Sequence, residues 1–136
     1  MKRQFTFLDH TADIKFKVAG HTPANLFENA AKAISFYASE GRKISTRLIT
    51  HVEIEGDDLE SLFYKFLDEI IFLLDSEGFI VGKAEVKLYG KSLKADLYGN
   101  LVKEYKVRQI KAATYAEMKI KEVEKGGWEA QVVLDV

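Results

Sequence analysis

The chain has 136 residues, a length that suits one ordinary domain with its own buried core. It contains no cysteine, which excludes disulfides, thiolate catalysis and zinc–thiolate sites. Its 20 basic and 21 acidic residues leave a net charge of −1, so the chain lacks the overall basic excess typical of nucleic-acid-binding proteins.

The N-terminal segment predicts two strands. Apolar and polar residues alternate in 5–7 and again in 14–18, which is typical of half-buried strands. The segment between them turns polar at Asp9 and His10, so no apolar run is long enough for a signal peptide or a membrane span. We therefore expect a cytoplasmic protein without membrane contact.

Two amphipathic helices are predicted, with a strand over 48–54 between them. The first helix covers 23–38, because Thr22 is a suitable N-cap and Pro23 suits the first helical position. The second follows a capping box of Asp57 and Glu60, carries a wide apolar stripe and ends near Gly78.

The remaining sequence predicts strands only. Alternating segments at 84–88, 93–97, 116–120 and 128–136 are separated by glycine-containing turns or by loops. Strands interleaved with two helices and followed by further strands indicate an α+β fold. We expect two helices packed on a mainly antiparallel β-sheet, in one domain that spans residues 1–136.

A polar cluster over 9–13 interrupts the first two strands. It contains two carboxylates, Asp9 and Asp13, together with His10 and Thr11. Such groups can bind a hard cation or provide a base that is oriented by an acid. The same residue types are common in turns, so the spacing alone also allows an ordinary hairpin connection.

The end of the chain carries a second acidic group. A strand pattern continues to Val136, and Asp135 lies out of phase with the apolar residues around it. The Asp135 side chain and the carboxylate of Val136 therefore come close together and repel each other unless a cation or a base offsets them. A solvent-exposed Asp at an ordinary terminus is the alternative.

A basic stretch near the middle of the second half is a candidate for contact with phosphate or with an acidic partner. It contains Lys103, Lys106, Arg108 and Lys111, with Tyr105 interleaved. Such a stretch is more often a solvated loop face, and Glu104 within it favours that interpretation. Nucleophile-elbow sequences and glycine-rich phosphate loops are both missing from the sequence.

Taken in order, several motifs resemble the archease family. They are His10–Ile14 (HTADI), Leu26–Ala31 (LFENAA), Asp58–Leu62 (DLESL), Ile110–Tyr115 (IKAATY), Trp128–Ala130 (WEA) and the ending Val133–Val136 (VLDV). They extend over essentially the whole chain, so the resemblance is much more specific than any one motif.

The resemblance implies a function as a protein cofactor rather than as an enzyme. Archeases assist an RtcB-type RNA ligase in tRNA splicing and RNA repair, where they promote guanylylation and repeated turnover of the ligase. The family binds a divalent ion, commonly assigned as calcium, and its ligands correspond here to Asp13, Asp135 and Val136. The resemblance also makes Lys111 and His10 candidates for contact with the partner or with phosphate, while RNA contact is expected to be indirect.

Some positions depart from the family pattern. The family usually has Trp where this chain has Phe66, His where it has Ala116, and Glu where it has Asn100, and the segment before Ile110 is shorter. Two alternative functions stay open at this point. One is a metal-dependent phosphoester hydrolase with His10 or Asp9 as its base, and the other is a chaperone-like structural module without an ion.

Overall fold

The computed structural model describes residues 4–8 and 13–136. In chain order, its elements are β1 (Phe5–Leu8), β2 (Asp13–Gly20), α1 (Pro23–Ala38), β3 (Leu48–Glu55), α2 (Leu59–Asp75), β4 (Phe79–Tyr89), β5 (Ser92–Leu101), β6 (Ala112–Glu122) and β7 (Trp128–Asp135). Two 3₁₀ turns, Val102–Glu104 and Glu124–Gly126, precede and follow β6. The predicted α+β class is confirmed.

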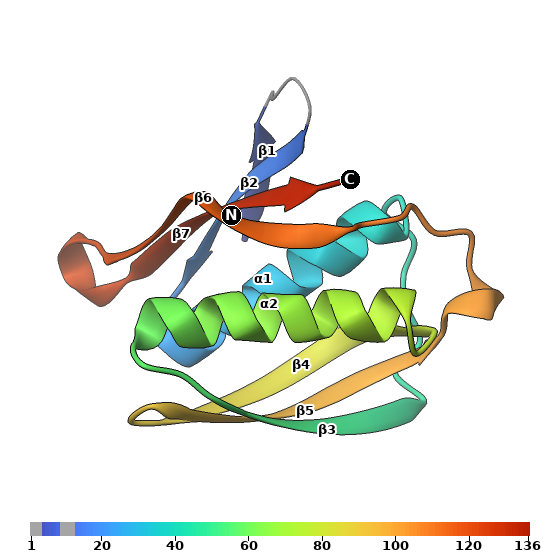
Figure 1. Ribbon diagram of the computed structural model, residues 1–136, viewed down its shortest axis with the longest axis horizontal. Coiled ribbons are helices and arrows are strands. Elements are labelled where there is room, and N and C mark those ends of the chain that lie inside the picture. Colours follow the sequence, from blue (N-terminus) through green and yellow to red (C-terminus); the bar gives the residue numbers. More distant parts are fainter. Residues whose placement is uncertain (1–3, 9–12) are drawn as a thin grey trace.

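The strands form two sheets, with the helices between them (Figure 1). One sheet has the order β1-β2-β7-β6 and the other β3-β5-β4, and each neighbouring pair is antiparallel. Helix α1 contacts β4 and β2, while α2 contacts β6 and β4, so each helix touches both sheets. The predicted antiparallel pairing is thus confirmed, and the strands are divided over two layers.

Both helices begin with a side-chain cap. Thr22 Oγ1 accepts a hydrogen bond from the Asn25 amide at 3.0 Å, as the sequence predicts. The second helix begins one residue later than predicted, because Asp58 has the extended backbone of an N-cap and its Oδ1 accepts from the Ser61 amide at 2.7 Å. The predicted capping box at Asp57 is therefore wrong. In the described part of the chain, neither helix is both long and apolar enough to cross a membrane.

Aromatic side chains fill the contact between the helices. The ring of Phe27 in α1 lies 4.9 Å from that of Phe63 and 5.7 Å from that of Phe66, both in α2. All three side chains are fully buried. Phe66, where the family resemblance leads us to expect Trp, is therefore a core residue, and the difference between the two residue types concerns packing.

The central strand of the three-stranded sheet requires glycine at one position. A Cβ atom on Gly99 would lie 1.9 Å from the carbonyl oxygen of Ile80 in β4, near the bulge between Val81 and Lys83. Because the obstructing atom belongs to the backbone of a paired strand, only a shift of β4 could make room for it.

We predict that Gly99→Ala lowers the free energy of unfolding by about 3 kcal/mol or more, at the upper end of the usual cost of overpacking. Urea unfolding followed by circular dichroism measures this change. Gly127→Ala is the control, because its Cβ would lie 3.4 Å from the Val123 side chain and 3.8 Å from the carbonyl oxygen of Gly20, which are ordinary van der Waals distances. Equal stability of the two variants would contradict the argument.

Candidate metal and partner site

The pairing of β2 with β7 brings the two ends of the sequence together. The register places Asp13 directly opposite Asp135, and Ala112 of β6 lies opposite Asp135 on the other side. Side chains directly opposite each other in an antiparallel pair have Cβ atoms about 4.5–5.5 Å apart and point to the same face. Two of the predicted ligand residues are therefore neighbours, although 122 positions separate them in the sequence.

The other predicted site residues lie close by or outside the described ranges. The amide of Lys111 donates to the carbonyl oxygen of Asp135 at 2.8 Å, so this exposed lysine adjoins the acidic pair. Val136 is half-buried and its side chain packs against the core, which holds the end of the chain beside β2. His10 and Asp9 lie outside the described residues, so their predicted roles stay predictions.

The donor set suits a hard divalent cation. Carboxylates are the preferred ligands of calcium, which takes six to eight oxygens. Among the described residues, however, no group of three Asp, Glu, His or Cys side chains is arranged to hold a metal. A cation between Asp13 and Asp135 would need the carboxylate of Val136 and further carbonyl or water oxygens. This is the composition that the family resemblance implies.

A bulge in β6 shapes the outer face beside this pair. The β6–β7 register runs from Thr114 opposite Val133 directly to Lys119 opposite Gln131. The intervening residues 115–118 therefore face a single residue of β7. Glu117 in this bulge has φ +58°, a left-handed conformation that costs a non-glycine residue about 1–2 kcal/mol. Bulges often re-aim a side chain next to a functional site.

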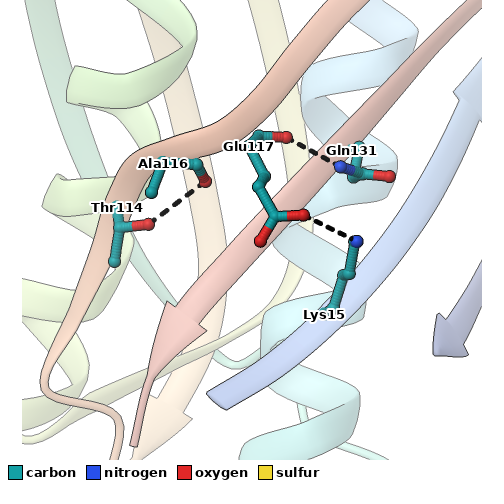
Figure 2. Close-up of polar contacts among 5 residues, drawn as sticks. All are labelled: Lys15, Thr114, Ala116, Glu117 and Gln131. Atoms are coloured by element: carbon teal, nitrogen blue, oxygen red, sulfur yellow. Dashed lines mark hydrogen bonds and ion pairs between the residues drawn. The ribbon is translucent and has the colours of Figure 1, made fainter. Parts of the chain in front are cut away.

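The bulge aims Glu117 across the sheet (Figure 2). Its carboxylate accepts from Lys15 Nζ of β2 at 3.0 Å, and its carbonyl oxygen accepts from Gln131 Nε2 of β7 at 2.8 Å. Lys15 pairs with Val133, which is only 2% exposed although it lies on the outer face. The bulge and the Lys15–Glu117 pair thus connect three strands next to the acidic pair.

The bulge also contacts the second helix. The ring of Tyr115 stacks on that of Tyr64 in α2 with a centroid distance of 3.9 Å and an angle of 16°. Burial raises the pKa of Tyr64, and the nearby Asp68 carboxylate and Tyr115 raise it further. The Tyr64 hydroxyl therefore remains neutral at physiological pH, and the stack anchors the bulge to the helix layer.

The sequence carried one signal for this bulge, which our prediction of a regular strand over 116–120 missed. Ala113 and Met118 are both buried although five positions separate them. In an uninterrupted strand, residues an odd number apart point to opposite faces. The break in period therefore marks the bulge, but it cannot show which side chain the bulge presents.

Two residues of the predicted basic stretch, Arg108 and Tyr105, make contacts within the fold. Arg108 pairs with Glu40 at 3.1 Å and lies over the ring of Tyr37 at 4.9 Å. Tyr105 points inward, where its hydroxyl accepts from the Ser45 amide at 2.9 Å. The candidate partner residue Lys111 thus stands apart from the rest of its stretch, because it alone is joined to the acidic pair by a hydrogen bond.

The pattern of the Archease protein family matches residues 5–136, which is nearly the whole chain. The chain belongs to the archease family.

Relatives from distant organisms resemble this archease-family chain over its full length. Protein archease from Pyrococcus furiosus is 38% identical, and the match covers 98% of this chain and 99% of the relative. A protein described as archease-like from Drosophila melanogaster is 32% identical over 98% of this chain and 90% of the relative. The similarity thus extends over nearly the whole of this chain.

Solved structures agree with the archease fold described above. A Methanobacterium thermoautotrophicum protein solved in solution has a TM-score of 0.79 and 31% identity, and the match covers 98% of this chain and 99% of that one. A Thermotoga maritima archease, described as a possible chaperone, has a TM-score of 0.69 and covers 100% of this chain and 98% of that one. At 22% identity, the second structure supports the fold alone.

Two residues that depart from the archease pattern, Ala116 and Asn100, lie in different environments. Ala116 is exposed in the β6 bulge, where its carbonyl oxygen accepts from Thr114 Oγ1 at 3.4 Å (Figure 2). Asn100 is 7% exposed and its side-chain amide donates to the Tyr105 hydroxyl at 3.4 Å. The first departure therefore alters the surface beside the acidic pair, and the second alters an internal hydrogen bond.

We predict that Glu117→Gly is more stable than Glu117→Ala by up to about 1 kcal/mol. Both variants lose the Lys15 ion pair, but only glycine relieves the left-handed backbone, which outweighs its larger conformational entropy in the unfolded chain. Thermal and urea unfolding of the two variants measure the difference. A more stable alanine variant would show that the bulge carries no backbone strain.

Proposed function

We propose that this chain is a cation-binding accessory protein of an RtcB-type RNA ligase, acting in RNA repair and tRNA splicing in the cytoplasm. The observation that carries the proposal is the direct pairing of Asp13 with Asp135 across β2 and β7. Membership of the archease family supports the ligase as the partner.

The acidic pair favours a cation on electrostatic grounds. Like charges directly opposite each other on a sheet are destabilising, and the nearby carboxylate of Val136 adds a third negative group. Three carboxylates offer up to six oxygens, which approaches the number that calcium requires. Calcium bound there would neutralise these groups and join the start of β2 to the end of β7.

The acidic pair is also positioned to meet a partner. It lies at the end of the β2–β7 ladder. The backbone amide of the exposed Lys111 donates a hydrogen bond to the carbonyl oxygen of Asp135 there. This end of the sheet therefore combines fixed carboxylates with a lysine, on strands that are paired on both sides. We propose that it contacts the ligase near its nucleotide and promotes guanylylation, so that the chain itself performs no chemical step.

Calcium is predicted to raise the melting temperature of the wild-type chain. A ligand that binds only the folded state stabilises it by about 2.7 kcal/mol at 100 times its dissociation constant. Asp13→Asn and Asp135→Asn should each remove the calcium-dependent shift, measured by differential scanning calorimetry against a chelator. Asp75→Asn at the end of α2 makes the same chemical change elsewhere and should keep the shift. A full shift in both site variants would exclude the site.

The ligase role is tested by multiple-turnover RNA ligation with the purified RtcB-type ligase of the same organism. The wild-type chain should increase turnover, and Asp13→Asn should reduce that stimulation about tenfold or more, while Asp75→Asn retains it. A wild-type chain that leaves ligation unchanged would contradict the partner. Full stimulation by Asp13→Asn would instead contradict only the role of the acidic pair.

A further inference from the structure

A second charged region lies on the outer face of the same four-stranded sheet. Lys17 of β2 and Lys119 and Lys121 of β6 border a shallow hollow of about 150 Å³, whose floor is formed by Glu129 and Gln131 of β7. We call this region the lysine hollow. It is separate from the acidic pair, because Lys17 lies four residues along β2 from Asp13, or about 13 Å at the usual rise of a strand.

Strand register makes the three lysines converge. Gln131 lies opposite Lys17 on one side and opposite Lys119 on the other, and Glu129 lies opposite Lys121. Lys119 and Lys121 are two positions apart, so they point to the same face. The two outer strands of this group are about 9.5 Å apart across β7, a span that long lysine side chains on both sides can bridge.

The charges of the lysine hollow are only partly compensated. All three lysines are exposed, and none has an ion-pair partner among the residues that the structure describes. Glu129 is the one carboxylate on the floor, which leaves two net positive charges. Lys15 on the same face differs, because Glu117 neutralises it at 3.0 Å. An anion seated in the hollow would remove the mutual repulsion of the lysines.

The floor of the hollow is held in place. Gln131 Nε2 donates to the carbonyl oxygen of Glu117 at 2.8 Å (Figure 2). This bond fixes the side-chain amide of a residue that lies opposite both Lys17 and Lys119 in the sheet. The strained bulge thus has a second effect, since it orients the side chain on which the lysines converge. Sites on paired strands keep their geometry better than sites on loops.

We propose that the lysine hollow binds phosphate groups, either of a nucleotide polyphosphate or of an RNA strand. Lysine ammonium groups bind phosphate as point charges and need no fixed fork geometry. The hollow is open and shallow, which suits one or more phosphates of a larger molecule that extends beyond it. The proposal does not depend on the cation site or on the ligase, because it rests on different residues.

The test uses the full chain in a chelating buffer, so that the acidic pair contributes no bound cation. Inorganic tripolyphosphate and a labelled ten-nucleotide single-stranded RNA serve as probes, with calorimetry and fluorescence anisotropy as readouts. The triple variant K17Q/K119Q/K121Q should bind at least tenfold more weakly than the wild type to whichever probe the wild type binds. Binding of tripolyphosphate alone identifies a nucleotide site, and binding of RNA identifies a strand site.

A matched control distinguishes the effect of the three lysines of the lysine hollow from the effect of a change in net charge. K83Q/K87Q/K94Q removes three exposed lysines from the outer face of the other sheet and gives the same net charge of −4, that is −1 − 3, as the hollow variant. This control should bind as the wild type does. An equal loss in both triple variants, or no binding of either probe at millimolar concentration, would overturn the proposal.

Two further readouts locate the contact. The side-chain amide resonances of Gln131 should shift during a titration with tripolyphosphate, and shifts confined to other regions would contradict the site. For RNA, the logarithm of the binding constant should fall against the logarithm of salt concentration with a slope of about −2 for three phosphate contacts. The hollow variant should lose most of this slope, and an unchanged slope would count against the lysines.

Discussion

The antiparallel register between β2 and β7 is the constraint on which the rest of the molecule depends. It runs from Asp13 opposite Asp135 to Gly20 opposite Trp128. A slip by one residue would turn Phe16, which is fully buried, toward solvent and would turn the charged residues of β2 into the core. The burial of apolar side chains on one face therefore fixes the positions of the acidic pair and the lysine hollow on the other.

The β6 bulge changes this outer face without disturbing the core. Its residues 115–118 alter the phase of β6, so that Ala113 and Met118 both remain buried on the inner side. On the outer side the bulge pairs Glu117 with Lys15 and holds the Gln131 side chain by a hydrogen bond. The cost is one left-handed non-glycine residue, at about 1–2 kcal/mol. Lys15 and Gln131 hold Glu117 in place, and the stacking of Tyr115 on Tyr64 holds the rest of the bulge, which explains how the strained conformation persists.

The sequence was sufficient to predict most helices and strands, but it was insufficient to predict how they are arranged in space. The first helix could be predicted over 23–38 because Thr22 and Pro23 mark its start chemically. The predicted start of the second helix was wrong by one residue. Asp57 and Asp58 are equally suitable N-cap residues until the backbone conformation is known. Alternation identifies which residues of a strand are buried, but it carries no information on which strand lies beside it. Neither the division into two sheets nor the Lys15–Glu117 pair could therefore be predicted.

A net charge near zero conceals an uneven distribution on one surface. Asp13 and Lys17 lie on the same face of β2, because an even number of residues separates them, yet one belongs to the acidic pair and the other to the lysine hollow. Lys15 between them is neutralised by Glu117 and adds no net charge. The separation of about 13 Å along the strand exceeds the screening length of about 8 Å at physiological ionic strength. The electrostatic interaction between the two proposed sites is therefore weak. A cation and a phosphate could accordingly occupy the two proposed sites at the same time, and neither would require the other.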